Sequence, residues 1–322
     1  MTTTICDSYE ASSRSIELTV GYHPVYVKLG HTKTYIGFNI AFFCCYLFWE
    51  LVMKTDVNTV KFQQFRSGKA TFSESDLIVE EPVALYVNGQ LWITFMCTPN
   101  QLKALAIGFL YNEGVIDSQD QVAEVHICDN REIIDVWLQH EAEKPKEWKR
   151  TSGCTGGYTA LDLDTLTPEV KDGVSLESDH VRHLVERLFE SQDLYKKTGG
   201  VHTSILTDGD QIIISAEDVG RHNSLDKIAG LYLFGNEIFT KKILLSTGRI
   251  SSDMLQKSAR IGAAIVISRT SPTSLSVELA EKWGITLIGY ARRDRFNLYT
   301  HPDRIIESNS TGLHHAIKKA SP

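Results

Sequence analysis

The sequence predicts an α/β protein with a small α+β domain over residues 53–150 and a larger α/β domain over residues 151–322. Three observations support this. The 322 residues suffice for two hydrophobic cores, and the 42% hydrophobic and 23% charged content is that of an ordinary globular protein. Strand-like alternation surrounds one amphipathic helix between residues 77 and 138. Beyond residue 201, strand and helix patterns alternate, which favours a largely parallel sheet covered by helices.

The first 52 residues precede this pattern and contain a strongly apolar run at residues 36–53. The run is slightly short for a membrane span and carries Asn39 and Glu50, so a membrane-associated extension is one interpretation. A secretory signal is disfavoured, because a long polar leader precedes the run and no small-residue cleavage site follows it. We favour a leader outside the fold, with the working protein beginning at Met53.

The small domain is expected to contain three or more strands. Two of them lie within residues 77–96 and meet at Asn88-Gly89, a dipeptide typical of two-residue hairpin turns. Strand-like alternation returns at residues 124–138. The charged, proline-containing segment at residues 140–150 then indicates a domain boundary.

One helix lies between these strands. Thr98 is predicted to cap it, with Pro99 at its first position and Gln101 completing a capping box. Gly114 is expected to end it. Its apolar face comprises Leu102, Leu105, Ala106, Phe109 and Leu110.

The larger domain is predicted to begin with an amphipathic helix whose apolar face is Val181, Leu184, Val185, Leu188 and Phe189. Strands at 201–207 and 211–216 then form a hairpin around Asp208-Gly209. Three further helices are expected near residues 223–234, 251–261 and 272–283. The strands that alternate with them lie near residues 242–246, 263–268 and 285–290.

Cys154 is the first candidate for chemistry, in the run TSGCTGG at residues 151–157. The surrounding glycines leave the sulfur unshielded and let backbone N–H groups turn toward it, which suits a reactive thiolate. A small buried apolar residue is the alternative, since most free cysteines are of that kind. The local sequence leaves both interpretations open.

Arginines follow each of the three late strands of the larger domain. Ligands of open α/β sheets bind beyond the carboxyl ends of the strands, where these arginines are expected to lie. Guanidinium groups bind phosphate oxygens through paired hydrogen bonds, so we predict a phosphate or pyrophosphate site. The candidates are Arg221, His222, Arg249, Arg269, Arg292, Arg293 and Arg295.

Simpler interpretations exist for these residues. The arginines could pair with Glu217, Asp218 and Asp294 on a solvated rim. His222 could shuttle protons or bind a metal, but such a residue more often hydrogen-bonds within its own turn. We expect His202, in a strand pattern, to be structural.

Several functions are disfavoured by what the sequence lacks. A zinc deaminase motif, a dinucleotide-binding glycine fingerprint and a P-loop are all absent from it. A net charge of −7 argues against broad nucleic-acid binding. The six cysteines match no zinc or disulfide framework, which favours a reducing, cytoplasmic compartment.

Together, these motifs resemble the FdhD family of formate dehydrogenase accessory sulfurtransferases. The similarity covers roughly residues 61–308, and the pair EDVGRHN and GYARRDRFNLYT is highly specific. The other matching stretches are VEEPVALYVNG, IGFLYNEGVI, TSGCTGG, TGGVHTSIL and STGRISSDMLQKSARIG.

The resemblance implies a cytidine-deaminase-like, three-layer second domain without a metal site. It implies that Cys154 takes sulfur as a persulfide from a cysteine desulfurase of the IscS type. The sulfur then passes to the molybdenum cofactor, a bis-molybdopterin guanine dinucleotide, for formate dehydrogenase; tungsten could replace molybdenum. A homodimer is also expected. The segment that matches the family's cofactor-binding stretch is Tyr290, Ala291, Arg292, Arg293, Asp294 and Arg295.

One departure from the family pattern affects the expected chemistry. Family members commonly carry a Cys-x-x-Cys pair, whereas Gly157 occupies the second position here. A persulfide needs only one cysteine thiol, so Cys154 can still carry sulfur. A disulfide or a sulfur relay within the loop would need a second cysteine and is therefore not expected. A chaperone that holds the cofactor without sulfur transfer therefore stays an alternative. A nucleobase-modifying enzyme is a third candidate, suggested by fold alone.

Overall fold

A computed structural model describes residues 55–146, 173–235 and 240–308, together with the backbone of a few short strands elsewhere. The chain forms two compact units, residues 1–55 and 56–322. Both the apolar run at residues 36–53 and the Cys154 loop lie outside the described residues. Among the described residues, no helix is long and apolar enough to cross a membrane. The short strands are β1 (Thr2–Thr3), β2 (Leu18–Thr19), β3 (Tyr26–Leu29), β4 (Thr32–Tyr35), β11 (Lys149–Arg150) and β12 (Tyr158–Thr159).

The first sheet of the second unit has the strand order β8-β7-β10-β9. Its strands are β7 (Glu81–Val87), β8 (Gln90–Cys97), β9 (Val122–Ile127) and β10 (Ile133–Leu138), with a 3-10 turn, η1 (Gln119–Gln121), before β9. Asn88 and Gly89 join β7 to β8 with φ angles of 49° and 78°, the positive values that this hairpin turn requires. The predicted hairpin is thus confirmed.

The helix α2 (Leu102–Asn112) packs on this sheet, but its predicted cap is wrong. Gln101, in the left-handed region at φ 49°, is the cap residue and makes no side-chain cap hydrogen bond. Thr98 lies three residues before Gln101 and does not cap the helix. Its N–H donates to Asp218 at the end of β15, and its hydroxyl accepts the N–H of Val219. Gly114, at φ 71°, follows the end of the helix as predicted.

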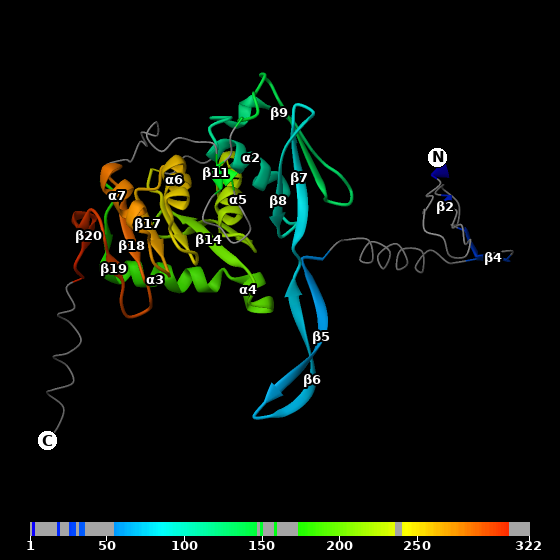
Figure 1. Ribbon diagram of the computed structural model, residues 1–322, viewed down its shortest axis with the longest axis horizontal. Helices are drawn as coiled ribbons and strands as arrows, with labels where there is room; N and C mark the ends of the chain where they lie inside the picture. Colours follow the sequence, from blue (N-terminus) through cyan, green and yellow to red (C-terminus); the bar gives the residue numbers. More distant parts are fainter. Residues whose placement is uncertain are drawn as a thin grey trace. The chain divides into compact units, whose positions relative to one another are not determined.

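A long hairpin precedes the first sheet and was not predicted. It consists of β5 (Val57–Arg66) and β6 (Lys69–Ile78), which form a two-stranded sheet with no third strand among those that the structure describes. Figure 1 shows it extending beyond β7 and β8. Its base contacts the larger domain, where the Ile78 side chain lies against Gly200.

The larger sheet has the order β15-β14-β16-β17-β18-β19. Only β16, β17 and β18 are mutually parallel, so the sheet is mixed rather than largely parallel. The β14–β15 hairpin adds antiparallel pairing on one side and β19 adds it on the other. The bounds are β14 (His202–Thr207), β15 (Ile212–Asp218), β16 (Ile243–Ser246), β17 (Ile265–Ser268), β18 (Thr286–Gly289) and β19 (Asn297–Leu298).

Helices cover both faces of this sheet (Figure 1). The helix α3 (Ser178–Glu190) packs on one face with the apolar residues predicted for it. The other face is covered by α5 (Arg221–Phe234), α6 (Ser252–Ile261) and α7 (Ser274–Lys282). The remaining elements are α4 (Asp193–Thr198), η2 (Pro302–Arg304), and the parallel pair β13 (Leu176–Glu177) and β20 (Ile305–Ile306).

Two glycines allow α2 and α5 to touch through their backbones. A Cβ on Gly108 would lie 1.7 Å from the carbonyl oxygen of Asp226, and a Cβ on Gly230 would lie 2.0 Å from that of Ala104. Because backbone cannot yield as a flexible side chain does, any larger residue would force the helices apart. Helix α5 is accordingly buried over the ten residues 221–230, between α2 and the sheet.

Candidate functional site

The carboxyl ends of the late strands meet at one edge of the larger sheet. Ser246 at the end of β16 is in register with Ser268 at the end of β17, and Ile267 is in register with Ile288 of β18. The loops that carry the predicted arginines therefore emerge side by side, as the sequence predicted. The start of β14 and the end of β15 reach the same edge, since His202 pairs with Asp218.

Arg221 lies at the centre of this edge. A Cβ on Gly248 would be 3.0 Å from Cβ of Arg221 and 3.1 Å from its Cδ, so the arginine side chain packs directly on the glycine backbone. Hydroxyls fix that backbone, because Gly248 donates its N–H to Ser246 Oγ at 3.2 Å and accepts from Ser268 Oγ at 2.7 Å. The glycine of STGR thus makes room for the arginine of VGRHN.

His222 follows Arg221 at the start of α5 and is buried. Its Nε2 lies 3.8 Å from Oδ2 of Asp253 in α6. Burial lowers the pKa of His222; the nearby Lys257 and Arg221 lower this pKa further, while Asp253 opposes the shift. The side chain is therefore held as a neutral imidazole at neutral pH.

His202 lies in the same cluster, although the sequence suggested only a structural residue. Its Nδ1 is 3.3 Å from Oγ1 of Thr247, and the same hydroxyl accepts the N–H of Thr203. Burial lowers the pKa of His202, and the positive charge of Arg221 lowers it further, whereas Asp218 opposes the shift. Two histidines and an arginine thus share one end of the sheet edge.

Arg269 and Arg292 form a second cluster at the next two strand ends. The guanidinium carbon of Arg269 lies 4.1 Å from the centre of the Phe189 ring, and Arg292 donates a hydrogen bond to the Arg269 carbonyl oxygen. Burial and the charge of Arg292 lower the pKa of Arg269, whereas Tyr195 opposes the shift. Neither guanidinium has an acidic partner within the described part of the chain.

The segment Tyr290–Arg295 is anchored on the neighbouring loop. Tyr290, at φ 51°, donates its N–H to the Thr270 carbonyl oxygen at 2.9 Å, and its side chain is exposed. Ala291 is buried and donates its N–H to the Ser268 carbonyl oxygen at 3.0 Å. The Arg292 N–H then bonds the Arg295 carbonyl oxygen at 2.8 Å, which closes a turn.

The outer arginines of the edge behave differently. Arg293 lies 4.0 Å from the partly buried Glu186, and Arg295 lies 3.8 Å from Asp294. The side chains of Arg293, Asp294 and Arg295 are largely exposed. Arg249 is exposed as well. Exposed pairs of this kind contribute about 0–1 kcal/mol to stability, so these side chains stay free to exchange partners.

The two other acids proposed as rim partners, Glu217 and Asp218, bind other groups of the fold. The Glu217 carboxylate accepts the N–H groups of Leu194 at 2.6 Å and Tyr195 at 3.1 Å, where it binds the start of α4. The fully buried Asp218 pairs with Lys227 Nζ at 2.7 Å. The rim interpretation therefore fits Arg293 and Arg295, each of which lies near an acidic side chain, whereas Arg269 and Arg292 have no such neighbour among the described residues.

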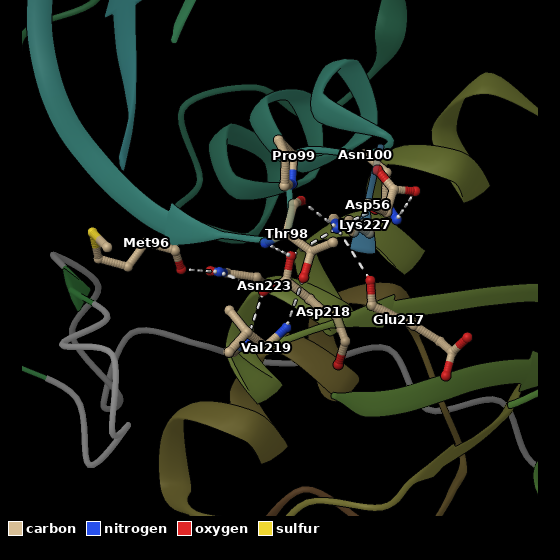
Figure 2. A network of polar contacts seen from close by, with 12 residues as sticks. Asp56, Met96, Thr98, Pro99, Asn100, Glu217, Asp218, Val219, Asn223 and Lys227 are labelled. Atoms are coloured by element: carbon tan, nitrogen blue, oxygen red, sulfur yellow. Dashed lines mark hydrogen bonds and ion pairs between the residues drawn. The ribbon is translucent and has the colours of Figure 1, made fainter. Parts of the chain in front are cut away.

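Asp218 organises the turn that leads into Arg221 (Figure 2). One carboxylate oxygen accepts the Gly220 N–H at 2.7 Å and the Asn223 side chain at 2.9 Å. The other accepts the Thr98 N–H at 3.2 Å and the Lys227 ammonium. Each lone pair is satisfied, which a buried carboxylate requires.

Lys227 ties the first sheet to the larger one. Besides Asp218, its ammonium donates to Asn100 Oδ1 at 2.6 Å and to the carbonyl oxygens of Thr98 at 3.2 Å and Glu217 at 3.1 Å. The Val219 N–H in turn binds Thr98 Oγ1 at 3.2 Å. The motif EDVGRHNSLDK thus places Arg221 and His222 by anchoring the residues on either side of them.

A second buried ion pair joins α5 to α6. Lys257 of α6 binds both carboxylate oxygens of Asp226, at 2.6 and 2.7 Å, and Asn112 of α2 donates to the same carboxylate at 2.7 Å. Three helices meet at this carboxylate, so it fixes α5 against α2 and α6. Among the described residues, no group of three acidic, histidine or cysteine side chains could hold a metal ion.

Cys154 lies outside the described residues, which contain two other cysteines, Cys97 and Cys128. Cys97 is fully buried, and burial together with the nearby Asp218 raises the pKa of its thiol far above the usual range. Cys128 Sγ donates to Asn130 Oδ1 at 2.7 Å. Cys97 is consequently an unreactive core residue.

Sequence comparison places the protein in a family. The profile of the FdhD/NarQ family matches residues 78–306. The chain belongs to the FdhD/NarQ family. It is 38% identical over 251 residues to the Sulfur carrier protein FdhD of Bacillus pumilus and 35% identical to that of Bacillus subtilis. Each match covers 76% of this chain and 95% of the relative.

A solved structure extends the comparison to the fold. The crystal structure of a protein named as a formate dehydrogenase accessory protein, from Desulfotalea psychrophila, superposes with a TM-score of 0.68 at 30% identity. The match covers all of that chain and 78% of this one.

Sequence reasoning missed three residues of the site. Phe189 was assigned only to an apolar helix face, His202 only to a strand, and Lys227 was not singled out. The single available signal was position, since Phe189 lies at the end of its helix and His202 at the start of its strand.

Proposed function

We propose that the chain is a sulfur carrier of the FdhD family, acting for formate dehydrogenase. Its similarity to relatives named as sulfur carriers spans 95% of their length, and the lone cysteine of TSGCTGG lies within the matched family region. The observation in the structure that supports a bound anionic substrate is the adjacent Arg269–Arg292 pair, which has no acidic partner among the described residues.

Sulfur loading would take place at Cys154. Its thiolate attacks the terminal sulfur of a cysteine desulfurase persulfide, a new S–S bond forms on Cys154, and the desulfurase cysteine leaves as a thiolate. No external oxidant or reductant is needed, because one persulfide is exchanged for another. Gly157 offers no second thiol to displace the sulfur within the loop.

The substrate that receives the sulfur would bind at the sheet edge. We infer that the guanine dinucleotide part of the molybdenum cofactor lies along Tyr290–Arg295, with its phosphates near Arg269, Arg292, Arg249 and Arg221. The guanidinium groups of Arg269 and Arg292, which have no acidic partner among the described residues, suit phosphate oxygens. The neutral His202 and His222 would accept or donate hydrogen bonds there without adding charge.

The finer assignments implied by the family resemblance belong to the same proposal. They are a cytidine-deaminase-like second domain, a cytoplasmic location, an IscS-type donor, molybdenum rather than tungsten, and a homodimer.

Mass spectrometry tests the proposal directly. After incubation with a cysteine desulfurase and cysteine, the wild-type protein should gain the mass of one sulfur, and Cys154→Ala should not. Cys97→Ala and Cys128→Ala are the matched controls and should load normally. Retention of the added sulfur in Cys154→Ala would refute the proposal.

A cofactor chaperone without sulfur transfer is the second candidate. Gly157 in place of a second cysteine keeps this alternative open, because the loop has no second thiol for a sulfur relay. A nucleobase-modifying enzyme is disfavoured, because the sequence offers no zinc motif. Absence of any added sulfur on the wild-type protein, with guanine nucleotide still bound, would select the chaperone.

A further inference from the structure

The β5–β6 hairpin has no place in the sulfur chemistry, yet it is the most exposed apolar feature of the described residues. Its two strands have ten residues each, and within the described ranges no third strand pairs with them. Phe65 is 69% exposed and Phe72 is 85% exposed, and Val60, Phe62 and Leu77 are also exposed. A two-stranded hairpin is at best marginally stable alone in water, so this one needs a partner surface.

Both faces of the hairpin carry apolar side chains. Neighbouring residues of a strand point to opposite faces, so Phe62 lies on one face and Phe65 on the other. The cross-strand register puts Ala70 opposite Phe65, and Gln63 opposite Phe72, on the same face. If one face of the hairpin packed on the rest of its own chain, the other face would stay exposed. Two such hairpins, called arms below, can wrap around each other and cover both faces.

The charges of the arm change sign along its length. Arg66 and Lys69 flank the turn at the tip. Lys61 and Glu74 face each other near the middle at 3.4 Å. Asp76 and Glu80 lie at or just beyond the base. The arm therefore has a cationic tip, a neutral middle and an anionic base.

We propose that the arm pairs antiparallel with the arm of a second copy of this chain about a two-fold axis near Lys61 and Glu74. In that arrangement the cationic tip of each arm lies beside the anionic base of the other. A parallel arrangement would place tip beside tip and is disfavoured by like charges. The inference rests on the proposed homodimer but is independent of sulfur transfer.

Charge reversal tests the arrangement without removing any apolar residue. In sedimentation velocity, Arg66→Glu with Lys69→Glu should raise the dimer dissociation constant about tenfold or more, because each change acts twice across the two-fold axis. Asp76→Lys with Glu80→Lys should do the same. All four changes in one chain should restore dimerisation, and so should mixing the two double variants.

Aromatic substitution gives a second measurement. Phe65→Ser with Phe72→Ser should yield monomers, whereas Leu275→Ser, at an exposed leucine of α7, should leave the dimer intact. A wild-type monomer at every concentration would overturn both the dimer and the arm proposal, and would indicate a different protein as the partner of the arm. A dimer unaffected by the reversals would overturn the arm proposal alone. Loading of Cys154 should be normal in all these variants.

Discussion

Two pairs of basic residues show how differently this protein treats positive charge. Lys227 and Lys257 are buried in the core around α5, and each binds an aspartate at 2.6–2.7 Å. Arg269 and Arg292 lie at the sheet edge, next to each other, without an acidic partner in the described ranges. Each buried ammonium group thus has a carboxylate counter-charge within the fold, whereas the two edge guanidinium groups do not have one among the described residues.

The physical reason for the contrast is desolvation. Removing an ammonium group from water costs several kcal/mol, and only a close carboxylate with further hydrogen bonds offsets that cost. The edge arginines remain partly exposed, so they fold without a counter-ion. Their mutual repulsion then favours an anion from outside. We therefore expect the lysines to stabilise the fold, and we propose that the arginines bind a ligand.

The largest predicted effect on the free energy of unfolding comes from removing a buried lysine. Lys227→Met leaves Asp218 buried without its counter-charge and should lower the free energy of unfolding by about 3–5 kcal/mol. Urea denaturation followed by circular dichroism measures it. Lys241→Met, at an exposed lysine, is the matched control and should change the stability by about 0.5 kcal/mol or less. A similar small change for Lys227→Met would contradict the assignment.

The buried histidine should make stability sensitive to acid. The pKa of His222 is lowered by burial and by Lys257 and Arg221, with Asp253 opposing, so the folded state resists the proton. In the unfolded chain histidine titrates near pH 6.5, so below about that pH the unfolded state binds a proton that the folded state does not. Stability contributed by the neutral imidazole is then lost as pH falls from about 6.5 toward the folded-state pKa.

His222→Gln removes this titration. Its unfolding free energy should fall less between neutral pH and pH of about 5 than that of the wild type, by about 1.4 kcal/mol for each unit of pKa lowering. Denaturation curves at several pH values provide the comparison. His183→Gln, at an exposed histidine, should keep the wild-type slope. Identical slopes for His222→Gln and the wild type would show that His222 is not the responsible group.

The smallest predicted effect on stability is shared by the inner and the outer arginines of the sheet edge. Arg269→Gln and Arg292→Gln should change the unfolding free energy by about 0.5 kcal/mol or less, because neither breaks an internal ion pair. Arg295→Ala should be equally neutral, since it removes only an exposed contact with Asp294. Differential scanning calorimetry checks all three. A loss comparable to that of Lys227→Met would show that the edge arginines are structural.

Local patterns predicted much of this fold. Asn88-Gly89, the alternation of β14 to β18 and the apolar face of α3 were read correctly, because each depends on neighbours in sequence. The cap at Thr98 was misread because this residue serves Asp218, which is 120 residues away. The mixed sheet order was likewise set by tertiary pairing. The β5–β6 arm, by contrast, is a local hairpin around Ser67-Gly68, whose turn the sequence analysis did not single out.

The sequence indicated which sheet edge carries the candidate site, but not which of the charged side chains there are paired within the fold. Strand ends at one edge follow from topology, so the loops that carry the arginines could be placed at one edge of the sheet. The sequence could not show that Glu217 and Asp218 are taken by α4 and Lys227, nor that Phe189 supports Arg269. Those contacts join segments far apart in the chain.

The central claim is that the inner arginines bind an anion from outside, and calorimetry with GDP as a fragment of the guanine dinucleotide tests it most directly. Each charge-assisted contact to phosphate contributes about 1.5–3 kcal/mol, so Arg269→Gln and Arg292→Gln should each weaken GDP binding about tenfold or more. Arg295→Ala should also weaken it, but less, and Lys241→Gln should not. All four variants should keep their fold. Unchanged GDP affinity in Arg269→Gln and Arg292→Gln, or no GDP binding by the wild type, would contradict the account.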